Sequence, residues 1–165
     1  MADKSSFTPE EWKLILASPM LAGLAVTMAE PSGIWGMLKE SMASANAVVT
    51  AGRAENASPL MKALLTDMET SEGRTIARDE ITAGMSGKSP AEIKQQVITK
   101  LAEVGKILDA KAPGEAAAFK TWLKYVADQV AESASEGGLL GFGGTRVTES
   151  EKATIAEVGR ALNVA

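Results

Sequence analysis

The side chains of this chain that could do chemistry are carboxylates, lysines and hydroxyls, because the sequence contains no histidine and no cysteine. Histidine moves protons most readily near neutral pH, and cysteine is the strongest nucleophile and main soft metal ligand. Their absence excludes Ser-His-Asp and Cys-His catalytic sites, zinc fingers, CxxC redox motifs and haem held by either residue. We therefore expect a protein that is not an enzyme and has no resident cofactor, unless carboxylates build a site.

One group of carboxylates lies near a predicted helix corner. Glu30 is the first charged residue after the uncharged run 14–29 and begins the link Glu30-Pro31-Ser32-Gly33, and Glu40 follows in the next predicted helix. A carboxylate at such a corner could hold a hard divalent cation together with backbone carbonyl oxygens. The alternative is a solvated loop carboxylate before a proline that ends the helix, because one or two carboxylates make a poor cage.

A second group of carboxylates lies further along the chain. Two of them could act as general acid and base if burial separated their pKa values, and Asp67, Glu69 and Asp79 are the candidates for such an enzyme. Positive charges are interleaved with them, and mixed charge on a helix favours a solvated face. The whole group is Asp67, Glu69, Glu72, Asp79 and Glu80, interleaved with Lys62, Arg74 and Arg78.

The segment Gly137–Gly144 has five glycines in eight positions and no charge. Three interpretations remain open: the apolar side chains Leu139, Leu140 and Phe142 pack under the bundle, they contact a protein partner or a second copy, or the backbone amides bind phosphate. The phosphate interpretation has no Gly-Lys-Ser/Thr and no preceding strand to support it.

A third group is cationic. Lys120 and Lys124 are four residues apart, next to Trp122 and Tyr125, and could present a positive face to an acidic partner or to lipid headgroups. Asp128 follows Lys124 by four residues, a spacing that favours a salt-bridged surface instead.

The elements that must position these residues are helices. Thr8-Pro9-Glu10-Glu11 and Ser89-Pro90-Ala91-Glu92 are capping boxes with proline at the first helical position, and Thr148 to Glu151 is a third box. No run of alternating β-branched residues predicts a strand. We expect an all-α, single-domain bundle of about six to eight helices over residues 1–165, with 1–7 as a flexible tail. The expected helices are 9–17, 19–29, 34–53, 59–69, 73–81, 91–110, 115–135 and 149–163, with 91–110 and 115–135 forming an antiparallel hairpin.

The net charge and the hydropathy of the sequence indicate which kinds of partner the protein can have. The net charge is −4, from 21 acidic and 17 basic residues, which argues against binding nucleic acid. The apolar run 14–29 is shorter than the roughly 20 residues that span a bilayer, so we expect no transmembrane segment and at most peripheral membrane contact. Glu10 and Glu11 precede that run, unlike the basic start of a signal peptide. We expect a cytoplasmic protein.

Two segments carry a resemblance to a known family. Met28–Ile34 and Gly143–Glu151 are similar to the helix-linking segments Ala-Asp-Gly-x-Val/Ile-Ser-x-x-Glu of the TerB-like family of bacterial tellurite-resistance proteins, although neither keeps the Asp-Gly pair. The resemblance implies an all-α fold and a role in stress or metal-ion response. It also implies Glu30 and Glu151 as metal-binding carboxylates.

Three hypotheses about function follow. The first is a non-enzymatic bacterial-type helical protein of stress or tellurite-type response that acts through protein–protein contact, as a homo-oligomer or with a partner. The second is a weak divalent-cation binder that uses Glu30, Glu40 and Glu151. The third is an enzyme that uses two of the carboxylates Asp67, Glu69 and Asp79, or a lysine nucleophile.

Overall fold

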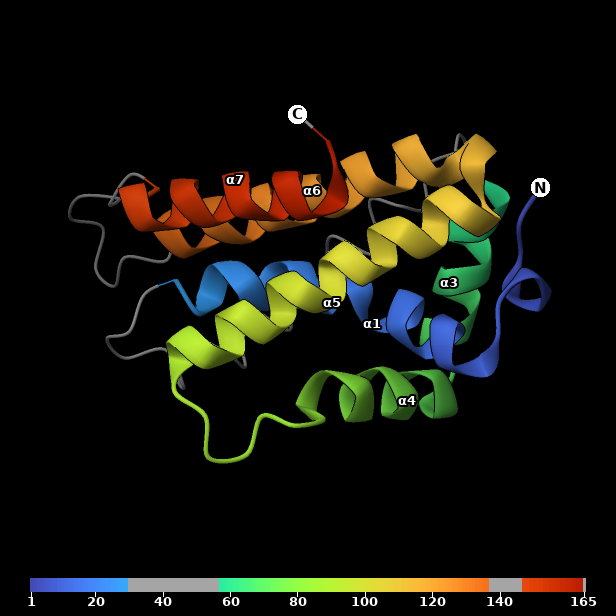
Figure 1. Cartoon of the computed structure of the whole chain (residues 1–165), viewed down its shortest axis with the longest axis horizontal. Helices are drawn as coiled ribbons and strands as arrows, with labels where there is room; N and C mark the ends of the chain where they lie inside the picture. The colour runs from blue at the N-terminus through green and yellow to red at the C-terminus, as the bar shows by residue number, and fades with distance from the viewer. Residues whose placement is uncertain (30–56, 137–146, 165) are drawn as a thin grey trace.

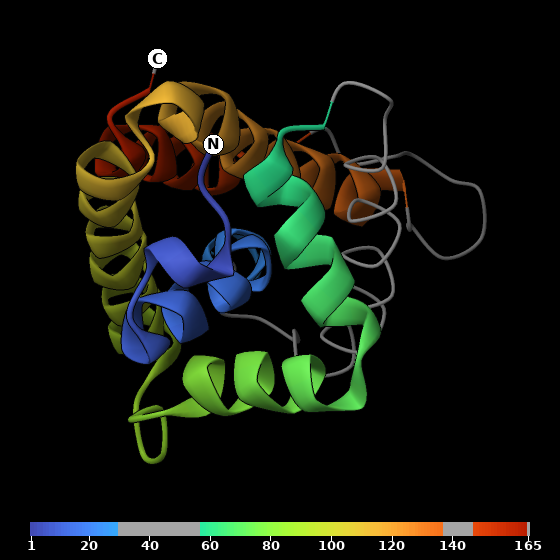
Figure 2. The same cartoon turned by 90° about the vertical axis from the view of Figure 1, so that its right-hand side faces the viewer.

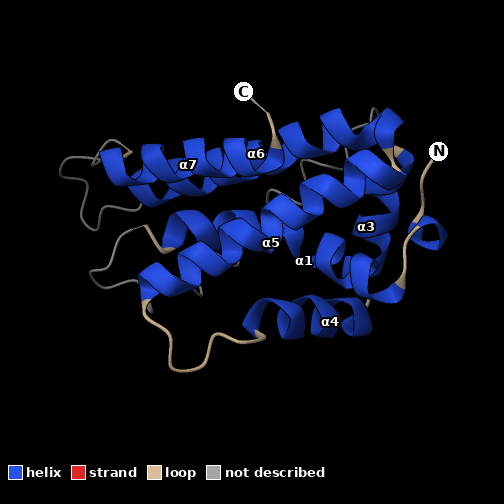
Figure 3. Cartoon of the chain, viewed as in Figure 1, coloured by secondary structure: helices blue, strands red, loops and turns tan. Residues whose placement is uncertain are grey.

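The structure is a computed structural model, and it describes residues 1–29, 57–136 and 147–164. These residues form helices joined by short links, without a strand among them (Figure 3), as the sequence predicts. The predicted helix 34–53 lies outside the described residues. The elements are η1 (Lys4–Ser6, a 3-10 helix), α1 (Pro9–Thr27), α3 (Pro59–Glu69), α4 (Ser71–Thr82), α5 (Pro90–Lys111), α6 (Pro113–Glu136) and α7 (Glu149–Leu162).

The predicted capping boxes begin three of the helices. At α1 the Glu11 amide donates to Thr8 Oγ1, and the Glu11 carboxylate accepts from the Thr8 amide at 2.7 Å. The same reciprocal pair begins α5 at Ser89 and α7 at Thr148. Each box satisfies two backbone donors that the first helical turn leaves without partners, which is why the sequence marks these boundaries well.

The prediction of two helices over 9–29 was wrong, because α1 continues through Pro19. Proline has no N–H, so the Ile15 carbonyl four residues earlier loses its helical donor. The Ser18 hydroxyl donates to that carbonyl at 2.6 Å, and Ser18 is fully buried. The serine thus satisfies the group that the proline leaves unpaired, and the helix is not interrupted.

Helix α1 lies at the centre of the bundle. Its apolar residues surround the helix instead of forming one stripe, as is typical of a helix buried on all sides. It contacts α3, α4, α5, α6 and α7. Figure 2 shows α1 in blue, enclosed by these helices. None of the helices in the described part of the chain combines the length and the apolar character needed to cross a bilayer.

The predicted hairpin is formed by α5 and α6, which Ala112 joins and which run in opposite directions along the molecule (Figure 1). Helix α7 packs on both. Small residues bring the helices close: a Cβ on Gly23 of α1 would lie 3.2 Å from Val130 of α6, and one on Gly105 of α5 would lie 3.5 Å from the Leu162 Cα of α7.

The N-terminal segment differs from the expected flexible tail. Ala2 and Phe7 are buried, and η1 lies against α3. Phe7 also stacks at a tilt on Trp12, with 5.9 Å between the ring centroids. These two apolar side chains place the segment against the bundle, beside the corner between α5 and α6.

Candidate functional site

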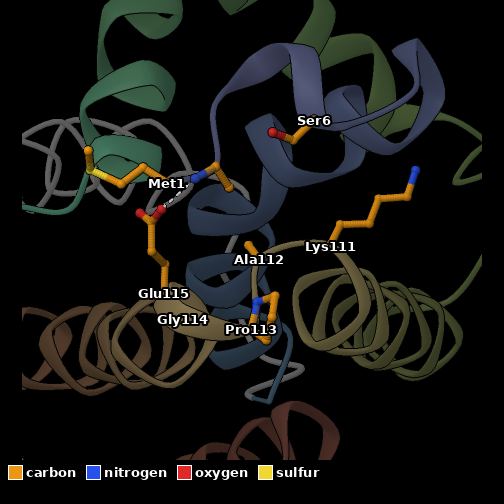
Figure 4. A pocket seen from close by; sticks show the side chains of 8 residues that line it. Met1, Ser6, Lys111, Ala112, Pro113, Gly114 and Glu115 are labelled. Carbon is orange, nitrogen blue, oxygen red and sulfur yellow. Dashed lines mark hydrogen bonds between the residues drawn. The ribbon is translucent and has the colours of Figure 1, made fainter.

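A pocket of about 360 Å³ lies where the N-terminal segment meets the corner between α5 and α6. The N-terminal segment contributes one wall and the corner contributes the other, as Figure 4 shows. The lining residues are Met1, Ala2, Ser6, Lys111, Ala112, Pro113, Gly114 and Glu115.

Glu115 is the central polar residue of this pocket. Its Oε1 accepts the Ala2 amide at 2.7 Å, and its Oε2 accepts the Leu60 amide in the first turn of α3 at 3.0 Å. Burial by itself would raise the pKa of Glu115, but the hydrogen bonds from Leu60, Ser58 and Ala2 outweigh it and lower the pKa below its usual value. One carboxylate of α6 therefore joins α6, α3 and the N-terminal segment.

Lys111, which lies on the same wall as Glu115, supplies a positive charge to the pocket. Its Nζ lies 2.6 Å from Glu11 Oε2, and the same oxygen accepts the Thr8 amide in the α1 capping box. The hydrogen bonds from Lys111 and Thr8 lower the pKa of Glu11. The end of α5 is thereby joined to the start of α1.

A second carboxylate holds the other end of the N-terminal segment. Asp67 Oδ2, on α3, accepts from Lys4 Nζ at 2.8 Å and from Trp12 Nε1 at 2.7 Å. Burial acts to raise the pKa of Asp67, but the hydrogen bonds from Lys4 and Trp12 lower it overall. Asp67 is the one member of the predicted acidic group that reaches this region.

The carboxylates of this region act in the structure as hydrogen-bond acceptors between segments. The hydrogen bonds that they accept lower the pKa values of Glu115, Glu11 and Asp67 and so favour their ionised forms. In the described residues, Trp122 Nε1 is the one buried side-chain nitrogen or oxygen without a hydrogen-bond partner. Each buried carboxylate oxygen and ammonium described here is therefore already engaged.

The predicted metal ligands are only partly described. Glu30 and Glu40 lie outside the described residues. Glu151 is buried at 8% exposure, and its Oε2 accepts the Thr148 amide at 2.8 Å within the α7 capping box. No group of three or more carboxylates that could hold a metal ion occurs among the residues the structure describes.

The described ends of the two segments behind the TerB-like resemblance are in contact. Ser150 Oγ, at the start of α7, donates to the Ala29 carbonyl at the end of α1 with a distance of 2.9 Å. Glu30 directly follows Ala29 in the sequence and Glu151 directly follows Ser150. The sequence contains no periodicity that would predict this contact, because 121 residues separate its partners.

The rest of the acidic group is divided among different partners. Glu80 pairs with Lys100 of α5 at 2.8 Å, whereas Asp79 pairs with the adjacent Arg78 on the exposed face of α4. Glu72 is exposed. The charges that looked like one group in the sequence thus serve the contact between α3 and the N-terminal segment, the contact between α4 and α5, and the surface.

Lys120 does not lie on the surface, which contradicts both the cationic face and the salt-bridged surface for this residue. This residue is 3% exposed, and its Nζ lies 2.6 Å from both carboxylate oxygens of Asp109 across the α5–α6 hairpin. Burial raises the pKa of Asp128, and the charge of Lys124 opposes that rise. Tyr125 is 46% exposed.

Leu139, Leu140 and Phe142 lie outside the described residues. The contacts of Glu115 were not predicted from the sequence, where it is one carboxylate after a proline and a glycine. Its hydrogen bonds join residues 55 and 113 positions apart, and no local pattern indicates such contacts.

No protein-family model, curated protein or solved structure matches this chain.

Proposed function

We propose that this protein is a non-enzymatic helical protein that acts through protein–protein contact, in a stress or metal-ion response of the tellurite-resistance type. The proposed role in such a response rests on the resemblance of segments 28–34 and 143–151 to the TerB-like family. The mode of action rests on one observation, the character of the exposed face of α6.

That face is uncharged over its first half. The exposed residues of α6 before Asp128 carry no charge, and they end with Tyr125 at 46% exposure. Interfaces are depleted in charged residues at their centre and enriched in tyrosine. The exposed residues of this face are Pro113, Gly114, Ala117, Ala118, Thr121 and Tyr125.

The other outer helices differ from α6 in this respect. Their exposed positions carry acidic and basic residues in alternation, which is typical of a surface that stays in water. Examples are Arg74 and Asp79 on α4, Glu103 and Lys106 on α5, and Lys152 on α7. The predicted contact residues Leu139, Leu140 and Phe142 also follow α6 in the sequence.

The test is the mass of the protein in solution. We would measure it by size-exclusion chromatography with light scattering over micromolar concentrations, on the intact chain, on Tyr125→Lys and on a triple variant with serine at 139, 140 and 142. An aromatic anchor at the centre of an interface contributes about 2 kcal/mol or more, so Tyr125→Lys should raise the dissociation constant at least tenfold.

Thr99→Lys is the matched control, because Thr99 is exposed on α5 and the substitution adds the same charge. We expect the intact chain and Thr99→Lys to be oligomers, and the Tyr125 and triple variants to be folded monomers with unchanged circular dichroism. The proposal that the partner is a second copy of this chain would be refuted by an intact chain that stays monomeric at every concentration. A Tyr125→Lys variant that associates as tightly as Thr99→Lys would also refute it.

Divalent-cation binding is a second candidate, favoured by the hydrogen bond between Ser150 and Ala29. Glu30 and Glu151 are each the next residue after one partner of that bond. A cation held by Glu30, Glu40 and Glu151 would join α1 to α7, in exchange for the hydrogen bond between Glu151 Oε2 and the Thr148 amide. Calcium and manganese titrations followed by calorimetry and thermal shift test it, with Glu30→Gln as the variant and Glu103→Gln as the control. A titration without heat and without thermal shift removes this candidate.

A further inference from the structure

Residues 2–7, which we call the strap, are held to the bundle at a few points. The Ala2 amide bonds to Glu115, the Lys4 ammonium bonds to Asp67, and Phe7 stacks on Trp12. Residues 3–6 between these points are exposed. A segment with few buried contacts and exposed backbone belongs to the part of a protein that opens at low free-energy cost.

The helix that follows does not depend on the strap for its first turn. Thr8 and Glu11 form their own capping box, in which both hydrogen bonds lie within residues 8–11. Lys111 adds an ion pair to Glu11 from the end of α5. The strap can therefore leave the bundle by rotation near Phe7 and Thr8, while the start of α1 keeps its donors satisfied.

The strap also forms one wall of the pocket at the α5–α6 corner, through Ala2 and Ser6. The opposite wall belongs to the bundle and stays in place when the strap leaves. We propose that residues 2–7 are a releasable strap that opens this pocket by leaving Glu115 and Asp67 while the helical bundle stays folded. This inference does not depend on the proposed protein–protein contact.

Release of the strap leaves the Glu115 carboxylate in the pocket with one oxygen free of its strap partner. Glu115 Oε1 loses the Ala2 amide, whereas Oε2 keeps the Leu60 amide from the first turn of α3. The carboxylate is then held in orientation by one oxygen and offers the other to the open pocket. Asp67 in turn loses the Lys4 ammonium and keeps the Trp12 indole N–H.

Thiol labelling tests the release, because the chain has no cysteine of its own. Ala2→Cys places a thiol at a buried position of the strap, and Ala127→Cys places one at a fully buried position of α6. The first thiol reacts with a disulfide reagent when the strap opens, and the second when the bundle opens. Each rate is divided by the rate of the same variant unfolded in urea.

We expect Ala2→Cys to react at least tenfold faster than Ala127→Cys, a difference of about 1.4 kcal/mol between the two openings. Adding Glu115→Gln or Asp67→Asn should raise the Ala2→Cys rate about tenfold. The Ala127→Cys rate should rise by less, because the substitution also weakens one contact within the bundle, with Leu60 or with Trp12. Glu103→Gln, at an exposed site on α5, should change neither rate.

Two results would overturn the proposal. Equal rates for the two thiols in the otherwise unchanged chain would mean that the strap leaves only when the whole bundle unfolds. An Ala2→Cys rate that neither Glu115→Gln nor Asp67→Asn changes would mean that these carboxylates do not hold the strap. If either carboxylate variant fails to fold by circular dichroism, the comparison of the two thiols in the unchanged chain still decides.

Discussion

Gly73→Ala should destabilise this protein, although alanine is the better helix former. Gly73 is the third residue of α4, and its amide donates to Thr70 Oγ1 at 2.8 Å. Thr70 is both the C-cap of α3 and the N-cap of α4, so the two helices meet at a single residue. This sharp corner brings the backbone of α3 close to Gly73.

The magnitude follows from the distances. A Cβ on Gly73 would lie 2.0 Å from the Asp67 carbonyl oxygen and 2.6 Å from its carbon, whereas non-bonded carbon and oxygen atoms keep about 3.3 Å apart. The obstacle is backbone, so no side-chain rotation relieves it. Overpacking of this kind costs up to about 3 kcal/mol, and alanine regains about 1 kcal/mol of helix propensity. The expected net loss is about 2 kcal/mol in the free energy of unfolding.

Urea denaturation followed by far-UV circular dichroism measures this loss, with Gly114→Ala as the matched control. Gly114 lies in the first turn of α6, and an added Cβ there meets no atom within 4 Å. That substitution should be neutral or stabilise the protein by up to about 1 kcal/mol. If Gly73→Ala unfolds at the same urea concentration as the unchanged chain or a higher one, the geometry of the α3–α4 corner described above is refuted.

Three further substitutions and one titration test other contacts. In urea denaturation, Asp109→Asn should lower the free energy of unfolding by about 3 kcal/mol, because it leaves the buried Lys120 ammonium unpaired. Lys120→Met should lower it by about 1 kcal/mol, because the carboxylate that it leaves unpaired is exposed. Equal losses would contradict this reasoning. Ser18→Ala should cost about 1 to 2 kcal/mol, since it leaves a buried carbonyl unpaired, and an unchanged urea midpoint would contradict it. The indole N–H resonance of Trp12 should report the titration of Asp67, with a midpoint below 3.8, the usual pKa of aspartate, because Lys4 and Trp12 stabilise the ionised form of Asp67. This contribution to stability is complete above the usual pKa and is lost as the pH falls through the pKa of the folded state. A midpoint at or above 3.8 would refute that assignment.

The parts of the fold that the sequence predicted are those fixed by local chemistry. The capping boxes at Thr8, Ser89 and Thr148 act over three residues, and the apolar spacing in α5 reflects one helical period. The start of the second predicted helix at Pro19 failed for an equally local reason. Ser18-Pro19 is typical of a helix start, but here the Ser18 hydroxyl donates to the Ile15 carbonyl that Pro19 leaves without a donor, and α1 continues.

The candidate site was beyond the reach of sequence patterns because its contacts join distant positions. Lys4 and Asp67 are 63 residues apart, and Ala2 and Glu115 are 113 residues apart. Lys120 shows the same limit. Its spacing from Lys124 predicted a shared exposed face, but its burial is decided by Asp109 on the preceding helix. Periodicity indicates which side of a helix is apolar, and it contains no information about which charged group lies opposite.

Helix α6 carries both proposals, and its geometry keeps them separable. Glu115 holds the strap near the start of the helix, and Tyr125 lies ten positions later, about 15 Å along the axis at 1.5 Å per residue. The pocket lining and the uncharged face share Pro113 and Gly114, but Glu115 and Tyr125 are far enough apart to contribute additively to stability. Tyr125→Lys should therefore leave the labelling rate of Ala2→Cys unchanged, and Glu115→Gln should leave the association of the chain unchanged. If either substitution alters both readouts, the strap and the uncharged face of α6 are parts of one interface, and the two proposals reduce to one.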